Sequence, residues 1–141
     1  GSMSGAIHPT LPADIAAGKL DSLRAFLSGR QTRDIDAVLD DTEKQDTLLT
    51  WAARHGQAEA VRLLLEAGAS PDATTGGGAS ALYIACQEDY PECARLLLEA
   101  GAAVNQARDN GFTPLFVACQ NGHLECARLL LEASAAIDQA A

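Results

Sequence analysis

Aromatic residues are scarce in this sequence, and this scarcity limits the kind of core that it can build. Only 4% of the 141 residues are aromatic although 48% are hydrophobic, so Ala, Leu and Val must fill the interior. This composition suits helices packed at short distances, because small side chains let the backbones approach one another. The length is that of a single domain.

Basic residues are also few. Ten basic and nineteen acidic side chains give a formal net charge of −9. A surface that binds phosphates needs clustered Lys and Arg, which this chain lacks. The charge therefore argues against nucleic acid and against an anionic membrane surface as partners. It favours solubility, with some bias toward partners that carry a basic patch.

Long apolar runs are absent as well. None approaches the length that spans a bilayer, and no signal-peptide pattern opens the sequence. We expect residues 1–8 to be an N-terminal tail that begins with a cloning remnant, Gly1-Ser2-Met3.

What the sequence does contain is a repeated unit. Thr47, Ser80 and Thr113 follow one another at intervals of 33 residues, and the residues after them stay in register. Such a period is typical of stacked units that are each too small to bury their own apolar face. A stack of this kind offers a surface for binding rather than a pocket for chemistry. A second marker shared by the three units is the run R-L-L-L-E, at residues 62–66, 95–99 and 128–132.

The third unit predicts a turn followed by two helices. Asp109-Asn110-Gly111 favours a tight turn. Thr113 is a good helix cap, and Pro114 suits the first helical position. We expect this helix to end near Gly122 and a second helix to begin at Glu125. The second helix should close before Ser134, where the other units have Gly68 and Gly101.

The segment from Thr113 to Asp138 resembles the ankyrin repeat, whose pattern is T-P-L-x-x-A-x-x-x-G-H-x-E-x-x-x-L-L-L-x-x-G-A-x-V-N. A weaker copy runs from Ala16 to Leu27. The resemblance implies an all-α solenoid of about four helix-turn-helix repeats, with β-hairpin fingers that project from each junction of a curved, L-shaped slab. It places the repeats within residues 9–138, at about 9–41, 42–74, 75–107 and 108–138, and makes residues 139–141 the start of a further finger.

Charged side chains recur on the second helix of each unit. Glu59, Arg62 and Glu66 are spaced as neighbours on a helix surface, and the same triplet returns twice. We interpret this ladder as a solvated outer face.

The four cysteines predict reduced thiols of a cytoplasmic or nuclear protein. Cys86 and Cys119 share one repeat position, which holds Ala53 in the preceding unit. Cys93 and Cys126 share another, which holds Ala60. A position that accepts Ala is small and apolar, and the spacing is not that of zinc ligands. We therefore expect no metal and no cofactor.

Catalysis is not predicted. His8, His55 and His123 are scattered over different repeats, and no nucleophile has a base at a convincing offset. We expect this protein not to be an enzyme.

Recognition is expected from the finger tips and from residues that follow the Ala pair of each inner helix, because these positions differ between copies. Phe112 is the favoured anchor. Tyr83 and Phe116 lie where ankyrin repeats usually carry a His that bonds between repeats, so that bond is in doubt here, and both contact with a partner and internal packing remain open for them. The candidate partner-binding residues are Glu43, Lys44, Asp46, Arg54, His55, Ala79, Tyr83, Gln87, Glu88, Asp109, Asn110, Phe112, Phe116, Gln120 and Asn121.

Four local departures from the repeat carry further expectations. The first finger is the longest and the most acidic, which is compatible with recognition or with simple loop variation. Gly76-Gly77-Gly78 predicts a mobile second finger. Trp51 occupies an apolar, core position. Leu129 to Leu131 leave an open apolar face if the array continues elsewhere.

The leading functional hypothesis is a protein–protein interaction module, an adaptor or scaffold whose partner is another protein or a peptide segment. Two alternatives remain. The Ala118-Cys119 and Glu125-Cys126 pairs resemble ankyrin arrays of SOCS-box proteins, which are substrate receptors of cullin-based ubiquitin ligases. The second alternative is that the array acts as a structural spacer within a larger protein.

Overall fold

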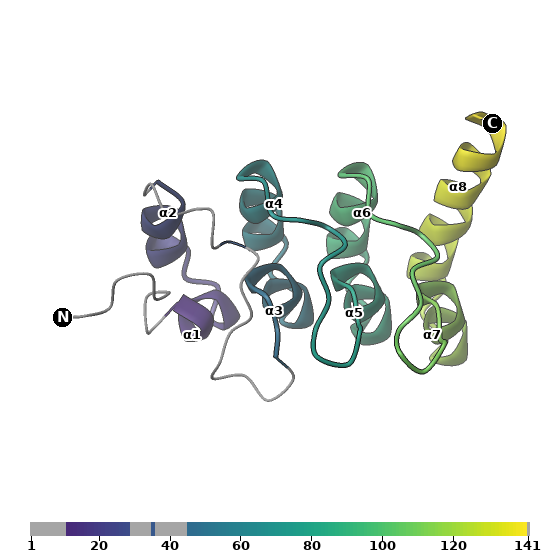
Figure 1. The fold of residues 1–141 in the computed structure, drawn as a ribbon, viewed down its shortest axis with the longest axis horizontal. Coiled ribbons are helices and arrows are strands. Elements are labelled where there is room, and N and C mark those ends of the chain that lie inside the picture. The colour runs from purple at the N-terminus through teal and green to yellow at the C-terminus, as the bar shows by residue number, and fades with distance from the viewer. Residues whose placement is uncertain (1–10, 29–34, 36–44, 141) are drawn as a thin grey trace.

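The computed structural model describes residues 11–28, 35 and 45–140, with side chains described up to residue 134. Helices pair off along this part of the chain, and the pairs stand side by side in two rows (Figure 1). We call α1, α3, α5 and α7 the inner helices and the others the outer helices. The elements are α1 (Leu11–Ala16), α2 (Asp21–Ser28), α3 (Leu48–Arg54), α4 (Ala58–Glu66), α5 (Ala81–Glu88), α6 (Pro91–Glu99), α7 (Pro114–Gln120) and α8 (Leu124–Ala140).

Side-chain caps begin the inner helices α3, α5 and α7. The hydroxyl oxygen of Thr47 accepts a hydrogen bond from the Thr50 amide at 3.1 Å, and Ser80 and Thr113 do the same one and two repeats later. Each cap satisfies an amide that the helix itself leaves without a partner, typically worth about 1 kcal/mol. Pro114 fits at the first position of α7, where no amide is needed. The predicted helix starts are confirmed.

One apolar layer runs between the two rows of helices. Ala52, Ala85 and Ala118 of the inner helices are fully buried, as are Leu64, Leu97 and Leu130 of the outer helices. Inner helices pack on the next inner helix and outer helices on the next outer helix. The small inner residues allow this close approach, and each buried Leu contributes about 1.5–3 kcal/mol. No single repeat encloses this layer, so stacking stabilises the fold.

Polar contacts tie each repeat to the one before it. The Trp51 ring is half-buried rather than fully in the core, and its Nε1 donates to the Pro12 carbonyl oxygen of the preceding repeat at 2.6 Å. His123 Nδ1 lies 2.8 Å from the Cys86 carbonyl oxygen, to which it donates. The amide of Gln57, at the equivalent position, donates to the Ala16 carbonyl oxygen at 3.1 Å. The fingers add further bonds between repeats, such as that from the Ala103 amide to Asp72 Oδ1 at 2.8 Å.

The outer helices carry the predicted charge ladder. Arg62 Nη1 lies 2.7 Å from Glu66 Oε2, and Arg62 also pairs with Glu59. The other two repeats form the same two pairs around Arg95 and Arg128. The hydrogen bond from Arg62 lowers the pKa of Glu59 below its ordinary value. These ion pairs are exposed to solvent, which weakens them, so the outer face is solvated rather than tightly held.

The last helix is longer than the sequence predicts. It was expected to close before Ser134, but α8 continues to Ala140 and occupies the place of the predicted further finger. Gly68 and Gly101, at the equivalent position, end their helices with φ of +100° and +92°. Ser is strained in that conformation, whereas the Ala-rich residues that follow favour a helix.

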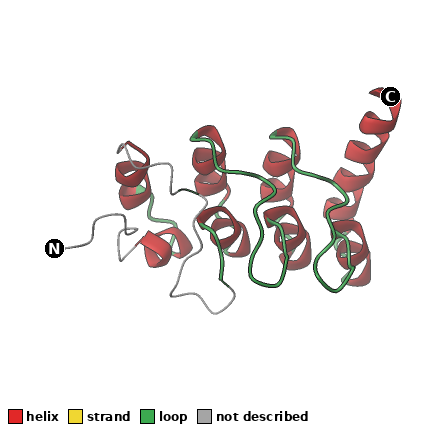
Figure 2. Ribbon diagram, viewed as in Figure 1, coloured by secondary structure: helices red, strands yellow, loops and turns green. Residues whose placement is uncertain are grey.

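The fingers are loops rather than regular hairpins (Figure 2). The second finger is residues 67–80 and the third is residues 100–113; of the first finger, the loop before α3, the structure describes residue 35 and residues 45–47. Among the described residues, β-pairing is limited to one isolated antiparallel bridge between Thr74 and Ser80. The third finger closes with a hydrogen bond from the Arg108 amide to the Phe112 carbonyl oxygen at 2.9 Å. Both fingers project beside the inner helices.

Candidate protein-binding surface

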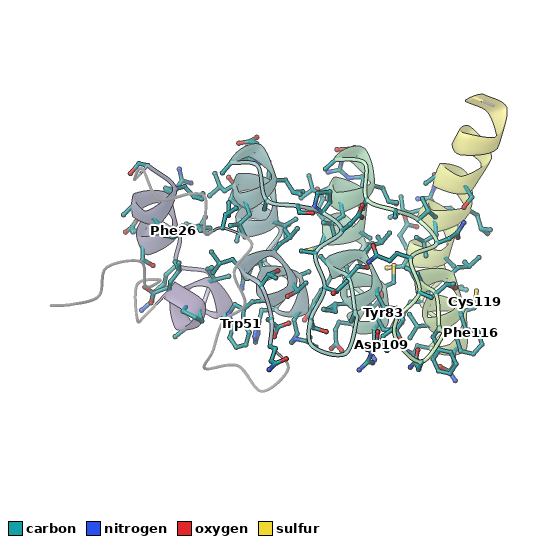
Figure 3. The ribbon with its side chains drawn as sticks, viewed as in Figure 1. Phe26, Trp51, Tyr83, Asp109, Phe116 and Cys119 are labelled. Atoms are coloured by element: carbon teal, nitrogen blue, oxygen red, sulfur yellow. The ribbon has the colours of Figure 1, made fainter. Side chains whose placement is uncertain are left out.

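The fingers and the inner helices form the face on which the sequence predicts recognition. Tyr83, Asp109 and Phe116 lie there, around α5 and α7 (Figure 3). Most of the predicted residues on this face have solvent-accessible side chains. Those that are exposed or partly exposed are Arg54, His55, Gln87, Glu88, Asp109, Asn110, Phe112, Phe116, Gln120 and Asn121.

Three of the residues predicted to lie on the binding surface are buried, so the prediction is wrong for them. Tyr83 is 2% exposed, and the Arg108 guanidinium lies over its ring, 5.7 Å from the centroid. Internal packing is therefore the role that the structure gives to Tyr83. Ala79 is covered within the second finger, where its carbonyl oxygen accepts from the Thr75 amide at 3.0 Å.

Asp46 is the third buried residue, at 1% exposure. Its carboxylate accepts from Arg54 Nη2 at 2.9 Å and from Nε at 3.3 Å. This pair holds the Arg54 side chain against the finger. Glu43 and Lys44, like most of the acidic first finger, lie outside the described residues.

Phe112 and Phe116 form an aromatic pair at the outer edge of this face. Their ring centroids are 4.5 Å apart, and the side chains are 38% and 45% exposed. The Phe112 amide donates to Asn110 Oδ1 at 2.9 Å, and Gly111 turns the chain with φ of +86°. Phe116 has the repeat position of Tyr83, but in the described structure no later finger covers it. The pair is thus a rigid, exposed apolar feature.

A cavity of about 230 Å³ is lined by residues of all three fingers and of the inner helices α3 and α5. Arg54 and Arg108 both line it, with amide side chains and glycines around them. Arg108 was not among the predicted residues, although it occupies a variable finger position equivalent to Thr75, and that variability was the available signal. Six of the lining residues are Gln45, Arg54, Gly76, Gly77, Gln87 and Arg108.

The triple glycine that lines part of this cavity has packing partners. A Cβ on Gly77 would lie 3.2 Å from Arg108 Nη2, and one on Gly76 would collide with the Gln45 amide. Gly78, with φ of +84°, lies against the Asp109 carboxylate. The glycines therefore allow neighbouring side chains to approach the second finger, a role that composition does not reveal. The predicted mobility of this finger stays a prediction.

Of the four cysteine thiols, three are buried and one is exposed. Cys86, Cys93 and Cys126 are buried, whereas Cys119 on α7 is exposed. Burial raises the pKa of Cys93 to about 11. A hydrogen bond with Cys126, together with burial, raises the pKa of Cys86. These environments suppress thiolate formation and reactivity.

Among the described residues, no group of three or more His, Cys, Asp or Glu side chains is placed to hold a metal ion. Likewise, none of the described helices is both long and apolar enough to cross a membrane.

Comparison with known proteins identifies the repeats. A family model described as ankyrin repeats (3 copies) matches residues 13–107 and 49–141. Ankyrin repeat family A protein 2 from Mus musculus is 35% identical over 83 residues, which are 58% of this chain and 27% of the mouse protein. The chain thus spans about a quarter of the length of this relative. Ankyrin repeats are generally non-catalytic modules of protein–protein interaction. With its paired helices, capped inner helices and projecting fingers, this chain belongs to the ankyrin repeat family.

Proposed function

We propose that this array is a non-catalytic adaptor or scaffold module that binds another protein through its finger tips and inner-helix surface. The observation that carries the proposal is the exposed pair of Phe112 and Phe116. Aromatic rings on a rigid turn lose little conformational entropy on binding and bury a large apolar area. They are therefore suited to anchor a partner.

The surroundings of this pair support the same function. Asn110, Gln120 and Asn121 are exposed polar residues nearby in sequence. Asn110 and Asn121 differ from their counterparts in the other repeats, whereas Gln120 repeats Gln87. A polar rim around an apolar anchor is the usual composition of an interface. The free thiols Cys86, Cys93 and Cys126 suit a cytoplasmic or nuclear setting, where disulfides are rare.

The proposal is tested by selecting a displayed library of random peptides on the wild-type chain and measuring the affinity of an enriched peptide. Phe112→Ala is expected to raise Kd about 30-fold, the equivalent of about 2 kcal/mol for an anchor residue. Leu124→Ala is the matched control, because Leu124 is an apolar side chain, 78% exposed, at the start of α8. Circular dichroism melting verifies that each variant folds.

The outcomes separate the hypotheses. Binding that is weakened by Phe112→Ala and by Phe116→Ala, but not by Leu124→Ala, supports recognition through this face. Equal affinities for all variants place the partner elsewhere and refute the assigned surface. A library that enriches no sequence favours a structural spacer.

A further inference from the structure

We propose that the cavity lined by the three fingers and by α3 and α5 binds the carboxylate of an Asp or Glu side chain within an extended segment of the partner. This inference rests on the proposed function and adds the chemistry of the ligand. It is carried by two arginines from different repeats, Arg54 and Arg108, which line the same cavity.

The first arginine is fixed in place. Arg54 comes from the last turn of α3, and its Nε and Nη2 atoms both donate to the Asp46 carboxylate. Because Asp46 is 1% exposed, the pair is anchored on the protein side of the cavity. Its charge is largely balanced there, so the excess positive charge of the cavity must come from the second arginine.

That second arginine is Arg108, from the third finger. Its guanidinium rests over the Tyr83 ring at 5.7 Å and adjoins the backbone of Gly77. Among the ion pairs of the described residues, none includes Arg108. Asp109 follows Arg108 in the sequence, and Glu88 lies at the end of α5, but neither acidic side chain lines the cavity. Stacking leaves the edge of a guanidinium free to donate hydrogen bonds.

Charge complementarity then selects the ligand. The chain as a whole carries a charge of −9, so an arginine that lines a cavity without an ion-pair partner differs from the rest of the surface. A guanidinium fork matches the two oxygens of a carboxylate. The amide side chains of Gln45 and Gln87 line the same cavity and are further donors. At this point of the face the partner is therefore acidic, in contrast to the basic patch that net charge alone suggests.

Size and position limit the source of the carboxylate. A volume of about 230 Å³ is below the usual 300–1,000 Å³ of pockets for cofactors or drug-sized ligands, so one side chain fits better than a nucleotide. The row of inner helices extends on both sides of α5, from α3 to α7 (Figure 1). A bound polypeptide has surface to follow in both directions, which favours an internal Asp or Glu over a chain terminus.

The test uses peptides enriched from the same displayed library, synthesised with amidated C-termini. Enriched peptides are expected to share an Asp or Glu at one aligned position. Replacing this Asp by Asn, or this Glu by Gln, should raise the Kd of the peptide for the wild-type chain about 10- to 100-fold. A loss of this size is expected for a lost charge-assisted hydrogen bond. Arg108→Gln should cause a loss of similar size and should make the chain insensitive to the peptide change.

Two further variants sharpen the result. Arg62→Gln is the matched control, because it makes the same change at an exposed arginine of the outer face. Binding should be recovered when the Arg108→Glu variant is combined with a peptide in which Arg replaces the acidic residue. Arg108 is preferred to Arg54 as the test site because Arg54 also supports the buried Asp46, and melting curves verify folding.

The failures of this inference and of the proposed function are distinguishable. Peptides that bind tightly without an aligned acidic residue, or whose acidic residue is insensitive to Arg108→Gln, overturn the carboxylate site while recognition stands. Binding that requires a free C-terminal carboxylate overturns the assignment to a side chain. A library that enriches no peptide counts against protein recognition itself and overturns this inference with it.

Discussion

The contact between Gly56 and Tyr90 provides a quantitative test of how the repeats are held together. Gly56 follows α3 with φ of +68°, and the Tyr90 ring of the next repeat lies directly over it. A Cβ at Gly56 would lie 2.5 Å from Tyr90 Cε1, well inside van der Waals contact. The substitution Gly56→Ala therefore introduces two separate costs.

The first cost is conformational and the second is steric. A left-handed backbone costs a residue with a Cβ about 1–2 kcal/mol. Forcing a methyl group into a packed contact costs about 1–3 kcal/mol more. We expect Gly56→Ala to lower the free energy of unfolding by about 2–5 kcal/mol, a large part of the 5–15 kcal/mol that is typical of a domain.

Gly122 is a matched control within the same chain. It has the equivalent repeat position and a φ of +73°, but nothing lies within 4 Å of its Cβ site. Gly122→Ala should therefore cost only the conformational term, about 1–2 kcal/mol. The difference between the two variants isolates the contact between repeats from the strain of the turn.

Urea denaturation followed by circular dichroism, and by the fluorescence of Trp51, the single tryptophan, measures both variants. The double variant Gly56→Ala/Tyr90→Ala should show a favourable coupling energy, because removal of the ring removes the clash. Equal losses for Gly56→Ala and Gly122→Ala, or the absence of coupling, would refute the steric account.

Two further predictions concern charges and thiols. Glu59 should titrate by NMR with a pKa below its ordinary value of 4.5 because Arg62 donates to its charged form; Arg62→Gln should return the pKa toward 4.5, and an unchanged pKa would contradict the ion pair. A lowered pKa means that this pair stabilises the fold above pH 4.5 and that its contribution disappears as the pH falls through the folded pKa. Cys119 alone should react rapidly with a thiol reagent at pH 8 in the native chain, and all four cysteines should react in denaturant. Rapid native reaction of Cys93 would contradict its burial and its pKa of about 11.

Much of the fold follows from local signals in the sequence. Thr47, Ser80 and Thr113 act as helix caps in the structure as their residue types predict, and the Glu–Arg–Glu spacing yields the predicted ion pairs. The same reasoning failed at Ser134, because a helix end depends on whether the chain tolerates a left-handed residue there. Gly68 and Gly101 end their helices in a left-handed conformation, whereas Ser at the equivalent position does not stop α8.

The candidate site was only partly predictable. Variation between repeats correctly marked finger positions as free of the shared packing pattern, and Phe112 is exposed as expected. The same criterion also selected Ala79 and Asp46, which are buried, and it missed Arg108. Variation reports that a residue is not needed for the repeated core, but it does not report what lies above that residue.

The period of the sequence by itself determined the family, the order of helices and the apolar layer, because caps, turns and helical spacing act within a few residues. Only the tertiary stacking decided which face residues meet solvent. Tyr83 and Phe116 share one repeat position, yet Arg108 of the third finger covers Tyr83, whereas Phe116 is 45% exposed. Arg54 and Arg108 reach one cavity for the same reason: stacked repeats bring together side chains that are far apart along the chain.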